Sequence, residues 1–431
     1  MSITRLEAHE IGPFKDLNIE FKPKPAGMED KAEIHILTGE NGTGKSTILM
    51  MLASCWDKTN DKLVENRFWN KNTGFFYEFS EIPTKYEIEF EETKFTSFSG
   101  VLMNGKSAYY AQISQNDFRF KDDIKIRNNS PFFAYSGSRN LTTSNNISIS
   151  EPDIDSIKDS ITFDKKIDFD SILNWIAVSK AKNAFALLRN DNNSAKKHEV
   201  VIRKIEESIS EILQKQVSFI IEEQPFQVFF KINDFNYDFN ILPDGLKSII
   251  TWLSDLLMRL DRIHWADKTR SILEQNFILF LDEIEVHLHP SWQRKILPVV
   301  QDLFPKAQIF ISTHSPFVVG SVDGARVYKF KLDENNNSVL DSEYWTEDGN
   351  SYDRILEEIF DIKERFGVGV QKQLDEFKEY KTKILKGETI DEEAFMKLAS
   401  EIAKQSIELN GIISFELRQL KRNTTQKLET A

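Results

Sequence analysis

The chain has 431 residues, of which 40% are hydrophobic and 29% charged, so it can bury a sizeable core and fold into more than one domain. Its formal net charge of -13 argues against a module dedicated to gripping nucleic acid, because such modules lean basic. A single cysteine excludes an intrachain disulfide. The N-terminus lacks a signal-peptide pattern, and no apolar run reaches the roughly 20 residues that span a bilayer. We therefore expect a cytoplasmic protein without membrane contact.

The start of the chain has the pattern of three strands, a loop and a helix. Ile3–Ala8 and Leu17–Phe21 alternate apolar and polar residues on either side of Gly12–Pro13, which predicts two strands and a turn. Ile34–Leu37 is a short apolar run directly before a glycine-rich loop, and Thr47–Trp56 has the apolar content of a helix. Strand, loop and helix in this order are the context that a phosphate-binding loop requires.

The middle of the chain changes from strands to helices. Tyr86–Phe90 alternates as a strand does, and Pro131–Tyr135 has the composition of a buried strand. Residues 154–213 are mostly helical by pattern. One helix in this region is predicted by an apolar stripe made of Val200, Ile202, Ile205, Ile209 and Leu213.

The second half of the chain predicts further strands and helices. Two strands are expected between Val217 and Ile232, and a strong amphipathic helix over Gly245–Ile263. The continuous apolar runs Phe277–Leu281 and Gln308–Ser312 are typical of strands buried on both faces. After about Asp341 we expect charged helices. The alternation of buried strands and helices predicts an α/β fold with a mixed or parallel sheet.

The loop from Gly39 to Ser46 matches the pattern GxxxxGK[ST], which predicts ATP binding. Its glycines let backbone N–H groups close around phosphates, Lys45 reaches the β- and γ-phosphates, and the Ser46 hydroxyl ligates Mg²⁺. The alternative, a plain glycine-rich turn, is disfavoured by the strand before the loop and the helix after it. The residues expected to hold the nucleotide are Asn41, Gly42, Thr43, Gly44, Lys45, Ser46 and Thr47.

An acidic pair, Asp282 and Glu283, follows the apolar run Phe277–Leu281, as in a Walker B motif. Asp282 is expected to hold Mg²⁺ through water, and Glu283 to orient or deprotonate the attacking water. The alternative is an acidic loop after a core strand. After the next apolar run, His314 is expected to donate a hydrogen bond to the γ-phosphate, against the alternative of a packing histidine.

The segment Leu242–Ser248 opens the long helix, and a helix N-terminus can bind a phosphate. A simple turn with Asp244 as helix N-cap is an equally good interpretation. If the segment binds nucleotide, its contacts would come from Asp244, Gly245 and Lys247. His287 and His289, with Glu285 nearby, lack the further ligands of a zinc site, so Mg²⁺ is the metal we expect.

Together these motifs resemble the ABC-type ATPases, in the branch that includes the SMC, RecF and OLD-like proteins. The resemblance identifies Glu285–Pro290 with the D-loop, His314 with the histidine switch and Leu242–Ser248 with the signature motif. Pro243 stands where that family has the signature serine, which leaves the rate of hydrolysis open. The glutamine loop of the family is not located. Its candidates are Gln112, Gln115 and the turn Tyr135–Arg139.

Within this branch the chain is most similar to the PtuA family of Septu anti-phage defence ATPases and to related retron-associated ATPases. The match rests on Leu242–Ser248, Glu285–Pro290 and the helical C-terminal region. The resemblance implies an ABC-type head with a helical insertion and a helical C-terminal region. The expected parts are an N-terminal lobe with Walker A (1–150), the insertion (151–214), a C-terminal lobe (215–345) and a helical region for oligomer or partner contacts (346–431).

The resemblance also implies a function. The chain would bind and hydrolyse ATP as a subunit of an anti-phage defence complex, forming a homo-oligomer built from head-to-head dimers. It would regulate a partner HNH endonuclease resembling PtuB and not itself be a nuclease, with DNA contact through the complex left open. The alternatives are a RecF-type DNA-repair ATPase that acts directly on DNA, and a nucleotide-sensing scaffold with little turnover.

Overall fold

The computed structural model describes residues 1–54, 56, 67, 74–79, 101–103, 106–111, 124–137, 141–142, 155–163, 166–223, 226–347 and 349–429. The chain divides into two compact units, Met1–Ile355 and Leu356–Ala431. The short helix α9 (Tyr352–Glu358) spans the boundary between them.

A seven-stranded sheet lies at the centre of the first unit, in the order β17-β16-β3-β15-β14-β7-β9. All its neighbouring strands are parallel except β17, which pairs antiparallel with β16. The predicted α/β sheet core is therefore confirmed. Its strands are β3 (Glu33–Gly39), β7 (Phe132–Tyr135), β9 (Ile161–Thr162), β14 (Ile278–Leu281), β15 (Gln308–Ser312), β16 (Arg326–Leu332) and β17 (Ser338–Trp345).

The prediction of helices from Asp341 onward is wrong for its first residues. Asp341–Trp345 belongs to β17, whose residues pair along β16, for example Ser342 with Lys329. The Asp341 carboxylate also forms an ion pair with Lys331 across the two strands. Hydrogen bonds to a neighbouring strand, which no local pattern reveals, decide the conformation of this charged segment.

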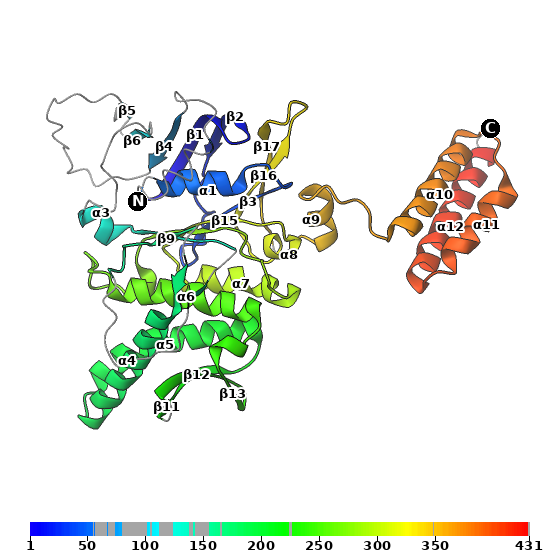
Figure 1. Ribbon diagram of the computed structural model, residues 1–431. Coiled ribbons are helices and arrows are strands. Elements are labelled where there is room, and N and C mark those ends of the chain that lie inside the picture. The colour runs from blue at the N-terminus through cyan, green and yellow to red at the C-terminus, as the bar shows by residue number, and fades with distance from the viewer. Residues whose placement is uncertain are drawn as a thin grey trace. The chain divides into compact units, whose positions relative to one another are not determined.

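The helix α1 (Lys45–Ser54) packs on one face of the central sheet, and α6 (Asp244–Arg262) and α7 (Pro290–Leu303) lie on the other (Figure 1). Most residues of α1 are buried, since a second, antiparallel sheet lies on the side of the helix away from the central sheet. That sheet has the order β2-β1-β4-β6-β5. Its strands are β1 (Ile3–Ile11), β2 (Phe14–Glu20), β4 (Gly74–Phe79), β5 (Val101–Met103) and β6 (Lys106–Ala111). The predicted strand Tyr86–Phe90 lies outside the described residues.

The described part of the region predicted as helical from 154 begins with a turn over residues 156–160 and two short strands, β9 and β10 (Ile167–Asp168). Asp168 accepts a hydrogen bond from the Ser171 N–H as N-cap of α4 (Phe169–Leu188), which places the helix start there. α5 (Asn192–Leu213) follows, and it buries most of the predicted apolar stripe. The short elements α3 (Ile124–Asn129) and β8 (Leu141–Thr142) precede this region, and β10 lies directly before α4.

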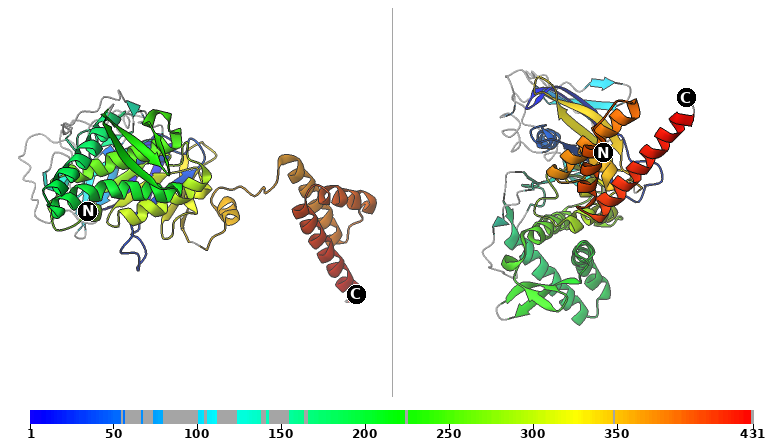
Figure 2. Two further views of the ribbon diagram at one scale, coloured as in Figure 1. Left: turned by 90° about the horizontal axis from the view of Figure 1, so that it is seen from below. Right: turned by 90° about the vertical axis from the view of Figure 1, so that its right-hand side faces the viewer.

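A three-stranded antiparallel sheet covers α4 and α5 on their outer side, as the view from below in Figure 2 shows. Both strands predicted between Val217 and Ile232 belong to it, so that prediction is confirmed. The sheet consists of β11 (Val217–Glu223), β12 (Phe226–Ile232) and β13 (Phe235–Tyr237). Further short helices in the described part of this unit are η3 (Phe239–Ile241), η4 (Ile272–Glu274) and α8 (Pro316–Val319).

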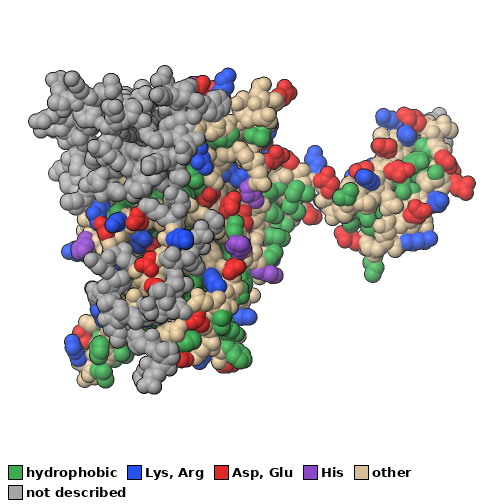
Figure 3. Space-filling model, viewed as in Figure 1, with side chains coloured by type: hydrophobic (Ala, Val, Ile, Leu, Met, Phe, Trp, Pro, Cys, Tyr) green, Lys and Arg blue, Asp and Glu red, His purple; other side chains and the backbone are tan. Residues whose placement is uncertain are grey.

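The second unit has a hydrophobic core of its own. It is built from α10 (Val368–Lys386), α11 (Glu392–Ala403) and α12 (Ile407–Glu429). Phe377 stacks on Phe395, and both contribute to the core around the fully buried Ile402. Acidic and basic side chains are mixed over its visible face (Figure 3). Among the helices of both units in the described ranges, none is long and apolar enough to cross a membrane.

Candidate active site

The ends of three parallel strands bring the predicted motifs together. β15 lies between β3 and β14, with Ser312 beside Leu37 and Ile311 beside Leu281. Since parallel strands end at the same edge of a sheet, the three loops that follow them meet there. These loops carry the phosphate-loop motif, the acidic pair and the predicted histidine.

The glycines of the phosphate-loop motif have conformations that other residues rarely adopt. Gly42 and Gly44 have φ values of +86° and +82°. At Gly44 a Cβ would lie 2.5 Å from the Phe14 ring and 2.6 Å from Pro13, so the turn between β1 and β2 packs directly beneath the loop. The opening strands of the chain therefore support the loop and set its shape.

Lys45 is buried at the first residue of α1. Its ammonium group donates hydrogen bonds to the carbonyl oxygens of Gly39 at 3.0 Å and Glu40 at 2.9 Å. Burial lowers the pKa of Lys45 to about 8, while the carboxylates of Asp282 and Glu283 offset part of this shift. A buried cation at a helix N-terminus is suited to a phosphate group.

The Ser46 hydroxyl donates a hydrogen bond of 2.9 Å to Asp282, which joins the two Walker motifs across 236 residues of sequence. The Ser312 hydroxyl donates to the same Asp282 oxygen and accepts the Glu283 N–H at 2.8 Å. Hydroxyl and carboxylate oxygens are the ligands that Mg²⁺ prefers, so this donor set fits the ion. Ser312 was missed by the sequence reasoning, although its position at the end of a predicted strand was a usable signal.

Glu283 has a positive φ of +47°, a conformation that is unfavourable for a residue with a side chain. Gly137 packs against it, since a Cβ at Gly137 would lie 2.7 Å from the Glu283 Cβ. The described part of the turn that follows Tyr135 thus lies beside the predicted catalytic carboxylate. The other glutamine-loop candidates, Gln112, Gln115 and Arg139, are outside the described residues.

Glu285 links the D-loop segment to the predicted histidine switch. Its Oε1 accepts the backbone N–H of His314 at 2.5 Å, and burial raises the pKa of its carboxyl group. Partial burial lowers the pKa of His314, and the positive charge of Lys45 lowers it further. This shift favours the neutral His314 imidazole, which keeps one N–H able to donate.

His287 and His289, the other two histidines near the site, have roles in the backbone turn and helix start before α7. His289 is the N-cap of α7 and accepts the Ser291 N–H at 3.2 Å. His287 has a φ of +64° in the turn before it. Within the described ranges, no three His, Cys, Asp or Glu side chains are grouped so that they could hold a metal ion.

The signature-like segment, Leu242–Ser248, contains the start of α6, and the N-cap residue there is not the one predicted. Pro243 occupies the N-cap position without a side-chain hydrogen bond, so the interpretation with Asp244 as N-cap is wrong. Asp244 is already helical and faces Lys247 at 3.9 Å. Gly245 lies against the D-loop segment, because a Cβ there would collide with the His287 carbonyl oxygen. Among the described residues, no hydrogen bond or ion pair joins Asp244, Gly245 or Lys247 to the phosphate loop of the same molecule.

A buried polar network connects α6 to the site. The Tyr135 hydroxyl donates to Asp255 at 2.8 Å, and the Arg259 guanidinium donates to the same carboxylate at 2.7 Å. Arg259 also donates to the backbone carbonyls of Ser156 and Lys158. The strand that ends beside Glu283 is thus tied to the helix that carries the signature-like segment.

Residues 34–320 match the protein family described as "AAA domain, putative AbiEii toxin, Type IV TA system". The match covers more than half of the chain. The chain belongs to this AAA family. The matched range includes the phosphate loop, the acidic pair and His314.

Curated proteins that are similar to this AAA-family chain include Septu PtuA proteins and retron ATPases. The retron Ec83 probable ATPase of Escherichia coli is 25% identical over 38% of this chain and 29% of its own length. Septu protein PtuA of Bacillus thuringiensis is 25% identical over 36% of this chain and 40% of its own length. The chain thus spans less than half of these two relatives. The retron Vc95 probable ATPase of Vibrio cholerae is 25% identical over 69% of this chain and 70% of its own length.

Among solved structures, the Smc head bound to the C-winged helix domain of ScpA is similar to this chain. The TM-score is 0.46 and the sequence identity 14%, and the match covers 80% of this chain and 98% of that one.

Proposed function

We propose that the chain binds and hydrolyses ATP as the ATPase subunit of an anti-phage defence complex. Nucleotide would close two copies head to head, and the closed assembly would control a partner HNH endonuclease. The observation that carries the ATPase part is the 2.9 Å hydrogen bond between Ser46 and Asp282, which unites both Walker motifs in one site. Membership of an AAA family and the likeness to Septu and retron ATPases support the defence part.

Each residue of the site has a task in hydrolysis under this proposal. Lys45 and the N-terminus of α1 hold the phosphates, and Glu283 orients the attacking water and accepts its proton. The water oxygen bonds to the γ-phosphorus as the bond between that phosphorus and its bridging oxygen breaks, and ADP and phosphate leave. The neutral His314 donates a hydrogen bond to the γ-phosphate, with its backbone held by Glu285. Mg²⁺, held by Ser46 and Asp282, would neutralise charge on the phosphates.

The start of α6 is the part of the site that a second copy would use. Its N-terminal N–H groups have no side-chain cap, so they can bind an anion from another molecule. Gly245 holds this end of the helix against the D-loop segment, which keeps both next to each other in one surface. We assign Asp244, Gly245 and Lys247 to the nucleotide of the partner copy. The second unit is our candidate for contacts with other subunits.

The Glu283→Gln variant tests the ATPase role. We expect the turnover of ATP to fall on the order of a hundredfold or more, because the amide cannot accept a proton. Nucleotide binding should remain, since the phosphate loop is intact. Glu334→Gln, an exposed glutamate in the turn between β16 and β17, is the matched control and should keep full turnover. Unchanged turnover in Glu283→Gln would favour the low-turnover scaffold instead.

A second experiment tests the partner. The chain is expressed with the product of the adjacent reading frame, which the proposal expects to be an HNH protein, and the two are purified through a tag on one of them. We expect a complex whose nuclease activity changes with ATP. A chain that never associates with such a protein, but binds DNA alone in a salt-sensitive manner, would favour the RecF-type alternative.

A further inference from the structure

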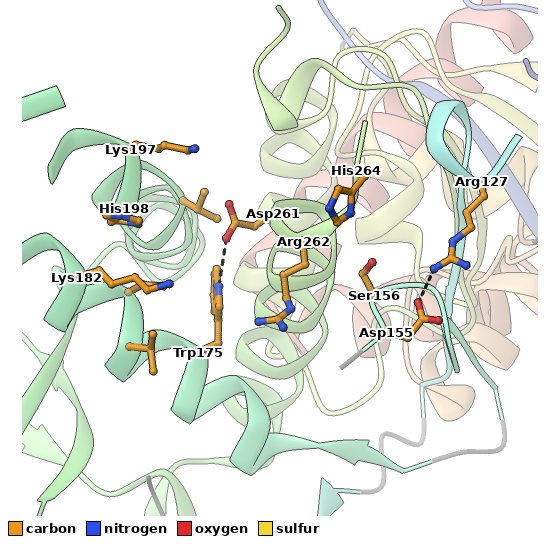
Figure 4. A pocket seen from close by; sticks show the side chains of 13 residues that line it. Arg127, Asp155, Ser156, Trp175, Lys182, Lys197, His198, Asp261, Arg262 and His264 are labelled. Carbon is orange, nitrogen blue, oxygen red and sulfur yellow. Dashed lines mark hydrogen bonds and ion pairs between the residues drawn. The ribbon is translucent and has the colours of Figure 1, made fainter. Parts of the chain in front are cut away.

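A cavity of about 500 Å³ opens between helices of the first unit (Figure 4). Its walls come from α3, α4, α5, the end of α6 and the chain at 155–156. The volume lies in the range of small-molecule sites, roughly 300–1,000 Å³. Its basic and imidazole side chains are Arg127, Lys182, Lys197, His198, Arg262 and His264.

The charge of this cavity is opposite to that of the chain. Four lysines and arginines line it against two aspartates, in a protein with a formal net charge of -13. One of the aspartates, Asp155, is paired with Arg127 at 2.8 Å. Like charges gathered from separate elements repel one another, and a bound anion would relieve that repulsion.

The second aspartate of the cavity, Asp261, lies near the basic side chains Lys197 and Arg262. Asp261 reaches solvent in the cavity and accepts a hydrogen bond from the Trp175 indole at 3.3 Å (Figure 4). Desolvation by the surrounding walls raises its pKa, and the nearby Lys197, His198 and Arg262 offset part of this rise. Lys197 and His198 of α5 and Arg262 of α6 all line this one cavity.

We propose that this cavity is a second anion site, which binds a phosphate-bearing small molecule of about nucleotide size. Lysine and arginine are the side chains that bind phosphate, and here one comes from each of the four helices α3, α4, α5 and α6. A small ligand matches a cavity of about 500 Å³ better than a nucleic acid strand does. A long polyanion would have to continue over the surface of a strongly acidic protein, whereas a small one needs only the cavity.

This site is independent of the phosphate loop. None of its lining residues belongs to β3, α1 or the loops after β14 and β15. The proposal therefore stands or falls separately from ATP hydrolysis. Arg262 lies at the end of the helix that begins with the signature-like segment, so an occupied cavity would contact both that helix and the insertion helices.

The experiment uses the full chain with Lys45→Ala, which disables the phosphate loop. Binding of tripolyphosphate and of ATP is measured by calorimetry at fixed ionic strength. We expect Lys45→Ala to retain one binding site for these probes. In Lys45→Ala/Lys197→Glu the affinity of that site should fall about tenfold or more, because a charged contact with phosphate is lost. Lys45→Ala/Lys196→Glu is the matched control, since Lys196 is the exposed neighbour outside the cavity. Lys45→Ala/Lys182→Glu tests the contribution of α4 and should also lose affinity.

The proposal is overturned if Lys45→Ala binds neither probe, or if the Lys196 and Lys197 variants lose affinity equally. A single-stranded oligonucleotide serves as competitor. If it binds to the cavity more tightly than tripolyphosphate, with affinity that grows with its length, the ligand is a nucleic acid and the small-molecule proposal is wrong. Relative to Lys45→Ala, circular dichroism should show unchanged helix content in the Lys182 and Lys197 variants, because both cavity lysines are exposed.

Discussion

Lys45 combines a positive charge with a buried position, and this combination makes nucleotide binding sensitive to pH. In the free protein its pKa is lowered to about 8 by burial, so the ammonium group loses its proton as pH rises past that value. A bound phosphate favours the charged form and raises this pKa again. Binding above about pH 8 must therefore take up a proton.

We expect nucleotide affinity to fall about tenfold between roughly pH 7 and pH 9, following the protonated fraction of Lys45. Calorimetry in buffers of different ionisation enthalpy should show roughly one proton taken up per nucleotide near pH 9 and roughly a tenth near pH 7. Equal affinity at both values, with no proton uptake, would contradict this assignment.

At the scale of elements, α6 connects several parts of the molecule that are far apart in sequence. Its first turn packs on the D-loop segment, and its middle is tied to β7 through Tyr135 and Asp255. Its end lines the cationic cavity at Arg262. The buried ion pair Asp255–Arg259 therefore joins the middle of α6 to β7 and to the chain at residues 156–158.

Replacing Asp255 by Ala should lower the free energy of unfolding of the first unit by about 3–5 kcal/mol, because Arg259 is left buried without its counter-charge. Denaturant unfolding measures this change. Asp244→Ala removes an exposed acid from the same helix and should cost less than about 1 kcal/mol. Equal losses in the two variants would mean that the buried pair contributes nothing beyond the charge of the helix.

At the scale of the whole molecule, the two compact units have separate hydrophobic cores. Their stability should therefore respond separately to mutation. Ile402 is fully buried in the core of the second unit, whereas Ile407 on α12 is 94% exposed.

We expect Ile402→Ala to destabilise the second unit by about 2–5 kcal/mol, because it leaves a cavity in that core. Ile407→Ala should change stability by less than about 0.5 kcal/mol. Hydrogen exchange of α10, α11 and α12 reports the stability, and nucleotide binding should be unchanged in both variants. Lost nucleotide binding in Ile402→Ala would show that the two units are coupled.

The sequence by itself determined the parts of the site that depend on local patterns. The phosphate loop, Asp282 and Glu283 are recognisable because each follows a buried apolar strand, and a glycine pattern over eight residues carries its own geometry. The α/β core was predictable for the same reason. The family resemblance then related His314 and the signature-like segment to these motifs.

Only the tertiary structure decided the features that depend on distant residues meeting. The pairing of β17 with β16, the Ser312 hydroxyl on Asp282 and the contact of Gly245 with the His287 carbonyl all join separate segments. The cationic cavity likewise gathers side chains from α3, α4, α5 and α6. Sequence patterns record which residues face inward or outward on one element, but not which elements pack together. The physical reason is that such contacts are selected by burial and hydrogen bonding in the folded chain.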